Sequence, residues 1–238
     1  MSVLYAVRHG QASFFKDDYD QLSPTGIEQA RLLGRYWVEN QVSITEVYSG
    51  SLVRQLDTAK AVGESFQEAG VPWPEVQVLE GLNEYHADQV MKFLKAEIVE
   101  KNESVRQLSE DFENAREDKE RYRSFHRLLE AVMKFYIAGD YECGGFETWE
   151  QFHNRVREAI GLIRSKEASG RKIAVFTSGG PIGVLVQTTL EAPDQQAGQL
   201  NWRVHNASIS QFTFSSNRIS LDQFNSIGHL QKEMQTYR

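Results

Sequence analysis

The segment that most constrains the fold is the run Lys-Ile-Ala-Val-Phe at positions 172–176. Its apolar residues would lie on both faces of an extended chain, which is typical of a central strand in a parallel sheet covered by helices on both sides. A Ser-Gly-Gly-Pro sequence follows at positions 178–181, and a helix is expected to begin there with Pro181 as its first residue. This pattern predicts an α/β fold with a mostly parallel sheet.

Strand-then-helix patterns recur before this segment. Ser23 can cap a helix that has Pro24 in its first position, although Thr25 with Glu28 offers a competing capping box. Another amphipathic helix is expected at residues 52–66. Strands are expected at residues 3–7, 44–49 and 76–79, with a terminal hairpin formed by residues 207–214 and 218–224.

Residues 87–136 have a different composition, since they are rich in charge and almost free of glycine and proline. Their periodicity predicts a pair of helices. These are either ordinary solvated helices or a cap over an active site that shapes substrate choice, and the two readings are compatible. Thr148 and Gln151 form a capping box for the next helix. The sequence therefore predicts one domain, residues 1–238, with a helical insertion at residues 86–145.

Composition excludes several classes of protein. The 238 residues carry a formal net charge of −7, which argues against broad nucleic-acid binding. The single cysteine, Cys143, leaves no intrachain disulfide to form. We expect no membrane association, because no run approaches the ~20 apolar residues needed to cross a bilayer. The N-terminal residues lack the features of a signal peptide, so a cytoplasmic protein is expected.

Polar side chains gather where the predicted strands end. The carboxyl ends of parallel strands lie at the same edge of a sheet, so loops from separate parts of the chain can converge there. Arginine forks match phosphate oxygens, and a helix N-terminus offers free N–H groups. A neutral imidazole can attack phosphorus, and a carboxylic acid can protonate the leaving oxygen. The residues concerned are Arg8, His9, Arg54, Glu84 and the sequence Ser178-Gly179-Gly180.

Each of these features is weak alone, because Arg54 could be a surface residue and residues 178–180 a plain tight turn. Together they predict phosphoryl chemistry on a small phosphorylated substrate, with His9 as the nucleophile. A cysteine-based phosphatase is set aside, because Trp149 stands six positions after Cys143 where an arginine is needed. A P-loop enzyme is excluded by the missing Gly-Lys-Ser/Thr signature.

Several motifs resemble the histidine phosphatase superfamily, also called the phosphoglycerate mutase-like family. The motifs are Arg8-His9-Gly10, the helix opening at residues 22–30, residues 49–59, which resemble the family's Ser-x-Leu-x-Arg-x-x-x-Thr-Ala segment, and Leu82-Asn83-Glu84. The resemblance implies a three-layer α/β/α sandwich around a mostly parallel sheet. It implies no metal and no organic cofactor, and a homodimer is plausible by analogy.

The resemblance also implies roles for single residues. His9 would become phosphohistidine, and Glu84 would donate a proton to the leaving group. The phosphoryl group would be held by Arg8, Arg54, Ser178 and Gly179, with Gln11 and Ser13 as further candidate contacts.

Two departures from the family pattern matter. Ser178 stands where a second catalytic histidine is usual, so the chain resembles a branch with Ser-Gly-Gly in that motif. A serine can donate a hydrogen bond but brings no positive charge, and loss of one preorganised donor costs about 10²–10³ in rate elsewhere. His205 and His229 are candidate spatial substitutes. In the first loop Gln11, Phe14 and Phe15 replace residues typical of mutases, which argues against glycolytic mutase activity.

The first hypothesis is therefore a histidine acid phosphatase-type hydrolase that acts on a small phosphomonoester. The alternatives are a non-catalytic pseudo-enzyme that binds a phosphorylated ligand, and a phosphoglycerate mutase-like phosphotransferase.

Overall fold

The computed structural model describes residues 1–13, 20–166 and 168–237, which divide into two compact units. One unit comprises Met1–Glu84 with Arg155–Arg238, and the other comprises Tyr85–Asn154. The assignment of residues 1–238 as one domain with an insertion at 86–145 stays a prediction.

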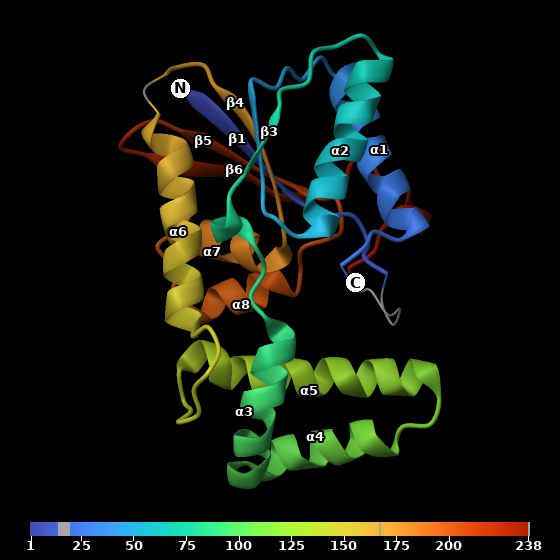
Figure 1. Cartoon of the computed structure of the whole chain (residues 1–238), viewed down its shortest axis with the longest axis vertical. Coiled ribbons are helices and arrows are strands. Elements are labelled where there is room, and N and C mark those ends of the chain that lie inside the picture. The colour runs from blue at the N-terminus through green and yellow to red at the C-terminus, as the bar shows by residue number, and fades with distance from the viewer. Residues whose placement is uncertain (14–19, 167, 238) are drawn as a thin grey trace. The chain divides into compact units, whose positions relative to one another are not determined.

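The first unit is built on a sheet of six strands among the described residues (Figure 1). These strands are β1 (Ser2–Arg8), β2 (Glu46–Ser49), β3 (Val76–Val78), β4 (Lys172–Thr177), β5 (Ile209–Phe214) and β6 (Ile219–Ser226). Their order is β3-β2-β4-β1-β5-β6. The first four in this order are mutually parallel, β5 pairs antiparallel with β1, and β6 pairs antiparallel with β5. The mostly parallel sheet and the terminal hairpin are thus confirmed.

Helices cover both faces of this sheet, which gives three layers. They are α1 (Pro24–Glu39), α2 (Val53–Glu68), α6 (Trp149–Ser165), α7 (Gly179–Thr189) and α8 (Gln195–Asn201). Strand β4 explains the layering, because its side chains alternate between two cores. Ile173 and Val175 pack with apolar residues of α6 and α7, whereas Ala174 and Phe176 pack with those of α1 and α2. The central strand is therefore apolar on both faces, as its sequence predicts.

Two of the predicted helix starts, at Pro24 and at Pro181, differ in outcome. Ser23 caps α1, since its Oγ accepts from the N–H of Gly26 at 3.1 Å, and the competing box at Thr25 is not used. Helix α7 begins at Gly179, so the prediction that Pro181 is its first residue is wrong. A proline fits this third position equally well, because none of the first four N–H groups has a partner inside the helix.

The second unit holds more helices than expected. Within residues 85–154, all of them described, the chain forms α3 (Ala87–Lys101), α4 (Glu103–Asn114) and α5 (Asp118–Ala138) before α6 begins. The prediction of a pair of helices is therefore wrong. Asn102 causes the difference, since it adopts an extended backbone and its side chain accepts from the N–H of Val105, which starts a new helix. The capping box of Thr148 and Gln151 is confirmed by two reciprocal hydrogen bonds.

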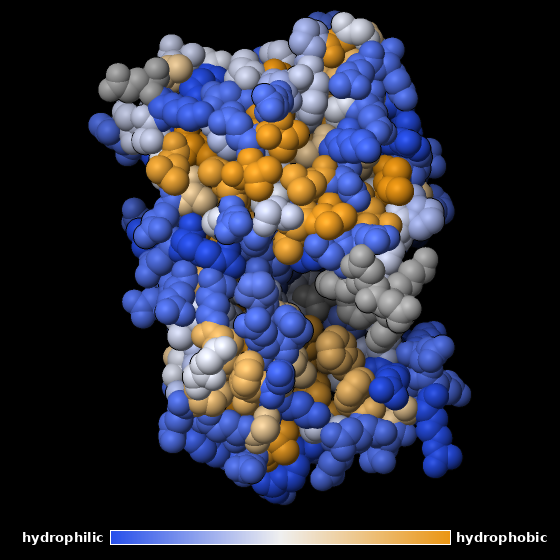
Figure 2. All heavy atoms as spheres, in the orientation of Figure 1, coloured by the Kyte–Doolittle hydropathy of each residue, from blue (hydrophilic) through white to orange (hydrophobic). Residues whose placement is uncertain are grey.

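Exposed apolar side chains occur on the first unit, and Figure 2 shows apolar atoms gathered across its visible face. The exposed large side chains include Val78, Leu162 and Leu190. Folded proteins normally expose much apolar surface, so these residues alone do not identify a partner. Of the helices in the described part of the chain, none is both long and apolar enough to cross a membrane.

The contact between the first loop and α1 leaves no room for side chains. A Cβ on Gly26 would lie 2.1 Å from the carbonyl oxygen of Gln11, and one on Gly10 would lie 2.3 Å from the carbonyl oxygen of Gly26. We expect Gly26→Ala to destabilise the fold by about 2 kcal/mol, because backbone must move. Urea unfolding measures the effect. The matched control is Gly161→Ala in α6, where an added Cβ meets no atom within 4 Å. That variant should be as stable as the parent or more so, and equal losses in both would contradict the steric argument.

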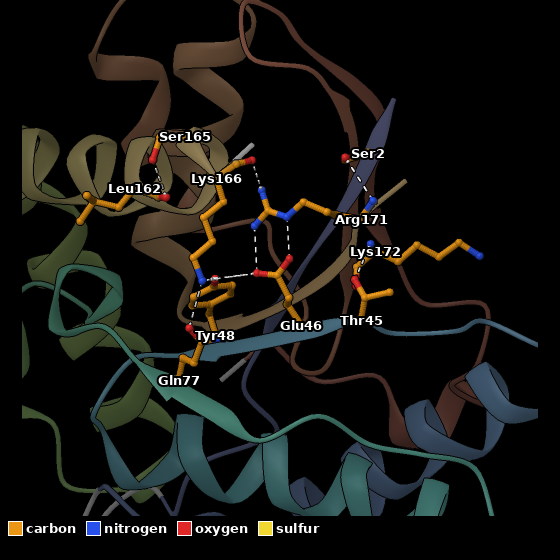
Figure 3. Close-up of polar contacts among 10 residues, drawn as sticks. All are labelled: Ser2, Thr45, Glu46, Tyr48, Gln77, Leu162, Ser165, Lys166, Arg171 and Lys172. Atoms are coloured by element: carbon orange, nitrogen blue, oxygen red, sulfur yellow. Dashed lines mark hydrogen bonds and ion pairs between the residues drawn. The ribbon is translucent and has the colours of Figure 1, made fainter. Parts of the chain in front are cut away.

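A polar cluster closes the opposite edge of the sheet, where β2 and β4 begin (Figure 3). The buried Arg171 guanidinium holds the Glu46 carboxylate with two hydrogen bonds, of 2.5 and 2.9 Å. The Tyr48 hydroxyl donates to the same carboxylate at 2.8 Å, and Lys166 Nζ lies 3.6 Å from it. The bonds from Arg171, the largest cause, and from Tyr48 lower the pKa of Glu46 to about 2.

We expect Glu46→Gln to lower the free energy of unfolding by about 2 kcal/mol at pH 7. Because the folded pKa is lowered, this stabilisation is present above about pH 4.5 and is lost as the pH falls toward 2. The difference between parent and variant in urea unfolding should therefore become smaller as the pH falls from 5 to 3. The control is Glu64→Gln, whose exposed pair with Arg31 at 3.4 Å should contribute less than about 1 kcal/mol. A pH-independent difference for Glu46→Gln would contradict the expectation.

Candidate active site

The register of the sheet brings the predicted loops together. Arg8 at the end of β1 pairs with Thr177 at the end of β4, and Ser49 at the end of β2 pairs with Phe176. The three strands therefore end almost level at the same edge. His9 and Ser178, the residues that directly follow β1 and β4, start neighbouring loops.

His9 lies buried at the centre of this edge, with 4% of its surface exposed. Its backbone is fixed on both sides, since its N–H donates to Thr177 and its carbonyl oxygen accepts from the N–H of Ala207. The next residue, Gly10, donates its N–H to Thr58 Oγ1 at 3.0 Å. The loop is therefore attached to β4, α2 and the segment before β5.

The hydrogen bonds of the imidazole define one tautomer. Nδ1 lies 2.7 Å from the carbonyl oxygen of Gly10, and Nε2 lies 3.2 Å from Nε of Arg54. A carbonyl oxygen can only accept and a guanidinium can only donate. We therefore assign the proton to Nδ1 and the unprotonated lone pair, which accepts from Nε of Arg54, to Nε2. This is the form in which imidazole is a nucleophile.

Burial lowers the pKa of His9 well below its usual 6.5, and the charges of Arg54 and Arg8 lower it further. In the phosphate-free protein we expect the ring to titrate below the usual 6.5, so at pH 5.5 it should be less protonated than an ordinary imidazole, which is about nine-tenths protonated there. The lowered pKa of His9 also makes the stability of the fold depend on pH. Below pH 6.5 the unfolded chain takes up a proton that folded His9 does not, so His9 lowers stability as the pH falls. Titration of the ring by NMR tests this, with His9→Ala to assign the signal, and a midpoint at or above 6.5 would contradict it.

Arg54 is oriented by a residue that the sequence did not single out. Arg54 is the second residue of α2, and 7% of its surface is exposed. Its Nη1 donates to Asp20 Oδ1 at 2.6 Å, and Asp20 Oδ2 accepts from the N–H of Val53 at 2.8 Å. The Asp20 carboxylate thus accepts a hydrogen bond from a free N–H group at the start of α2. The N-cap residue of this helix, Leu52, makes no side-chain cap.

Arg8 approaches the same histidine from β1. It is buried, and its Nη1 donates to the carbonyl oxygen of Val204. Its main-chain N–H donates to Ser208, so both contacts lie in the segment before β5. Arg8 is close enough to His9 to lower the pKa of the imidazole by charge.

Glu84 faces the start of α7. Its Oε2 accepts from the N–H of Gly180 at 3.0 Å. The segment before it is held by Arg155, whose guanidinium donates to the carbonyl oxygens of Gly81, Asn83 and Glu84. The structure therefore joins Glu84, which the resemblance predicts to be the proton donor, to the glycine-rich start of α7.

Ser178 and Gly179 are buried at the N-terminus of α7. Ser178 Oγ accepts from Nε2 of Gln55 at 2.9 Å. Gly179 must lack a side chain, because a Cβ there would lie 2.3 Å from Asn201 Oδ1. Gln55 directly follows Arg54, so α2 contributes to both sides of the site.

The two remaining phosphate-binding candidates have less direct positions. Gln11 Oε1 accepts from the Ser23 hydroxyl at 2.8 Å, which commits that oxygen to the cap of α1. Ser13 is buried, and its N–H donates to Gln21. Phe14 and Phe15 lie outside the described residues.

Neither His205 nor His229, the two candidate substitutes for the expected histidine, has a described contact with Ser178. The His205 ring packs on Tyr237, with ring centroids 3.9 Å apart, and its Nδ1 lies 3.3 Å from Asn225 Oδ1. The His229 ring packs against Tyr36, and burial lowers its pKa to about 4. Among the described contacts of Ser178, the side chain that reaches its hydroxyl is that of Gln55, not an imidazole.

A series of hydrogen-bonded polar side chains, which sequence reasoning missed, holds the loop that contains His9. Gln29 is fully buried and accepts from the N–H of Gln11 while donating to Thr236. Thr236 donates to Asn206, whose amide donates to the carbonyl oxygen of His9 at 3.3 Å. The one available signal was a polar residue on the buried face of a helix, at position 29. In the described residues, no group of three or more His, Cys, Asp or Glu side chains could hold a metal ion.

The comparison with protein families agrees with this geometry. The sequence model described as the histidine phosphatase superfamily (branch 1) matches residues 4–142 and 133–227. The chain belongs to this superfamily. Membership supports a phosphatase-type enzyme. A search of curated proteins gave no match.

Solved structures with the same fold include members with different named activities. A mutant phosphoserine phosphatase from Entamoeba histolytica in complex with phosphoserine is 19% identical, covers 97% of this chain and 100% of its own, and has a TM-score of 0.63. A phosphoglycerate mutase from Bacillus anthracis is 17% identical, covers 96% and 94%, and has a TM-score of 0.62. A mycobacterial glucosyl-3-phosphoglycerate phosphatase is 20% identical, covers 94% and 98%, and has a TM-score of 0.59. At these identities the likeness shows the fold alone.

Proposed function

We propose that this chain is a phosphatase that hydrolyses a small phosphomonoester through a phosphohistidine formed on His9. The observation that carries the proposal is the arrangement of the His9 ring. Its Nε2 is deprotonated and lies 3.2 Å from Nε of Arg54, and its Nδ1 is held by the carbonyl oxygen of Gly10. A neutral, oriented imidazole beside a guanidinium is suited to attack a phosphoryl group that the guanidinium holds.

In the first step His9 Nε2 forms a bond to phosphorus, and the bond between phosphorus and the ester oxygen breaks. Arg8 and Arg54 hold the non-bridging oxygens and oppose their charge. Glu84, protonated at this stage, gives its proton to the departing oxygen, which leaves as an alcohol. The hydroxyl of Ser178 and the N–H of Gly179 add neutral donors at the start of α7.

In the second step a water molecule attacks the phosphohistidine. The Glu84 carboxylate takes a proton from this water, and the bond between phosphorus and Nε2 breaks. Inorganic phosphate leaves, His9 returns to the neutral form, and Glu84 is protonated again. Every proton is accounted for without a metal ion or an organic cofactor, as the family resemblance implies.

The substrate class we propose is a small, acidic phosphomonoester. One structural relative is described in complex with phosphoserine, and another structure of a phosphoserine phosphatase is described with 3-phosphoglyceric acid. These two compounds and glucosyl-3-phosphoglycerate are therefore the first to test.

Product analysis without added metal tests the proposal. The protein is incubated near pH 6 with each phosphomonoester and with an aryl phosphate, and released phosphate is measured beside any isomerised phosphoester. We expect phosphate release and an acid-labile phosphoenzyme. Isomerisation of 3-phosphoglycerate with little phosphate release would favour a mutase instead.

Ser178 favours one alternative, a pseudo-enzyme that binds a phosphorylated ligand, because a serine brings no positive charge to the site. Binding of orthophosphate without turnover and without a labelled histidine, in a folded protein, would support it. The cap role of the insertion, a homodimer and a cytoplasmic location remain predictions.

A further inference from the structure

Gln55 is a residue of the site edge to which the proposed mechanism gives no role. It is fully buried in the first turn of α2. Its Nε2 donates to Ser178 Oγ at 2.9 Å and to the carbonyl oxygen of Leu82 at 3.3 Å. One side chain therefore joins the three segments that carry Arg54, Glu84 and Ser178.

The hydrogen bond from Gln55 also decides what the Ser178 hydroxyl can do. Ser178 is the N-cap residue of α7, yet its side chain makes no cap. The usual targets of a cap are the second and third N–H groups of the helix. The second belongs to Gly180 and is held by Glu84, and the third position is Pro181, which has no N–H.

Ser178 Oγ instead accepts from the amide of Gln55. A hydroxyl has a single hydrogen, and that hydrogen is not used in a bond in which the hydroxyl accepts. Among the residues that the structure describes, no acceptor takes it. The Ser178 hydroxyl is thus left as a donor, which is what a phosphoryl oxygen needs.

The orientation of the Gln55 amide is fixed by its surroundings. Its Oε1 is buried and, in the described part of the chain, has no hydrogen-bond partner. This oxygen faces Gly50, where an added Cβ would lie 2.0 Å away. Exchanging the two amide atoms would place Oε1 against the carbonyl oxygen of Leu82, which is repulsive. An unpartnered buried oxygen costs free energy, and such groups often have a functional reason.

We propose that Gln55 is a positioning residue for phosphoryl transfer, which holds the Ser178 hydroxyl as a neutral donor to the phosphoryl group. This inference rests on the proposed function. It gives Ser178 a partner at the position where the family resemblance leads one to expect a histidine.

A double-mutant cycle tests the pair, with Gln55→Met, Ser178→Ala and the double variant. Calorimetry gives Kd for orthophosphate, and an aryl phosphate gives kcat and KM. We expect Ser178→Ala to lower kcat by ~10²-fold and Gln55→Met by ~10-fold, each with a weaker orthophosphate affinity. Because Gln55 acts through Ser178, the double variant should match Ser178→Ala, not reach the ~10³-fold product of independent effects.

The matched control is Gln187→Met, another buried glutamine that lies eight positions along α7 from Gly179, or about 12 Å. It should change stability without changing Kd or kcat. If Gln55→Met does not fold, Gln55→Leu replaces it in the cycle.

Multiplicative effects in the double variant, or a folded Gln55 variant with the parent's Kd and kcat, would overturn the inference. If the parent binds orthophosphate but never turns over, the proposed function fails, and the cycle in Kd alone still decides the role of Gln55. A parent that binds no orthophosphate overturns both.

Discussion

Replacing His9 with alanine is expected to lower phosphatase turnover by ~10⁴-fold or more and to abolish the labelled phosphoenzyme. The physical reason is that the variant loses the atom that forms the covalent intermediate, and removal of a nucleophile elsewhere costs up to about 10⁶ in kcat. Rapid quenching after incubation with a ³²P-labelled substrate measures the label, and phosphate release measures the turnover.

His9→Ala should still bind orthophosphate, because Arg8 and Arg54 remain. That result separates loss of chemistry from loss of folding. The control is His86→Ala, which removes an exposed imidazole. Turnover should be unchanged there. A His9→Ala protein that keeps both turnover and label would show that the nucleophile is another residue.

Glu84→Gln is expected to act differently on substrates with different leaving groups. With an alkyl phosphate, such as phosphoserine, kcat should fall by ~10²–10⁴-fold, because the departing alkoxide needs a proton. With a nitrophenyl phosphate the first step should be nearly unaffected, since that phenolate is stable without protonation. The second step still lacks its base, so a burst of nitrophenolate and an accumulated phosphohistidine should follow.

Glutamine is a suitable replacement because its carbonyl oxygen can still accept from the N–H of Gly180, which Glu84 does at 3.0 Å. Glu80→Gln is the matched control, since Glu80 is an exposed carboxylate in the same segment. Equal losses on both substrates, with no accumulated phosphoenzyme, would argue that Glu84 has a structural role only.

Local patterns in the sequence were sufficient to predict the framework of the first unit. A continuous apolar run predicted β4 as a central strand, and the structure places Ile173 and Phe176 in the cores on its two sides. The Ser23-Pro24 pair predicted the start of α1 correctly. These features depend on residues close in sequence, where steric and hydrogen-bonding preferences act directly.

The same sequence was less informative where two local signals compete. Position 102 is neither glycine nor proline, so no residue that usually breaks a helix marks an interruption there. The helix is nevertheless interrupted, because the side chain of Asn102 caps the start of α4. Proline fits more than one position in the first turn of a helix, so Pro181 did not fix where α7 begins. The helix begins two residues earlier, at Gly179, which packs against Asn201.

The sequence by itself determined which loops carry His9, Arg54, Glu84 and Ser178, because parallel strands must end at one edge of the sheet. Only the tertiary structure decided how these side chains are held. Gln55 reaches Ser178 across 123 positions, and Gln29 reaches the carbonyl oxygen of Met234 across 205. Such bonds depend on where whole elements pack, and no preference of a residue for helix, strand or turn encodes its distant partner.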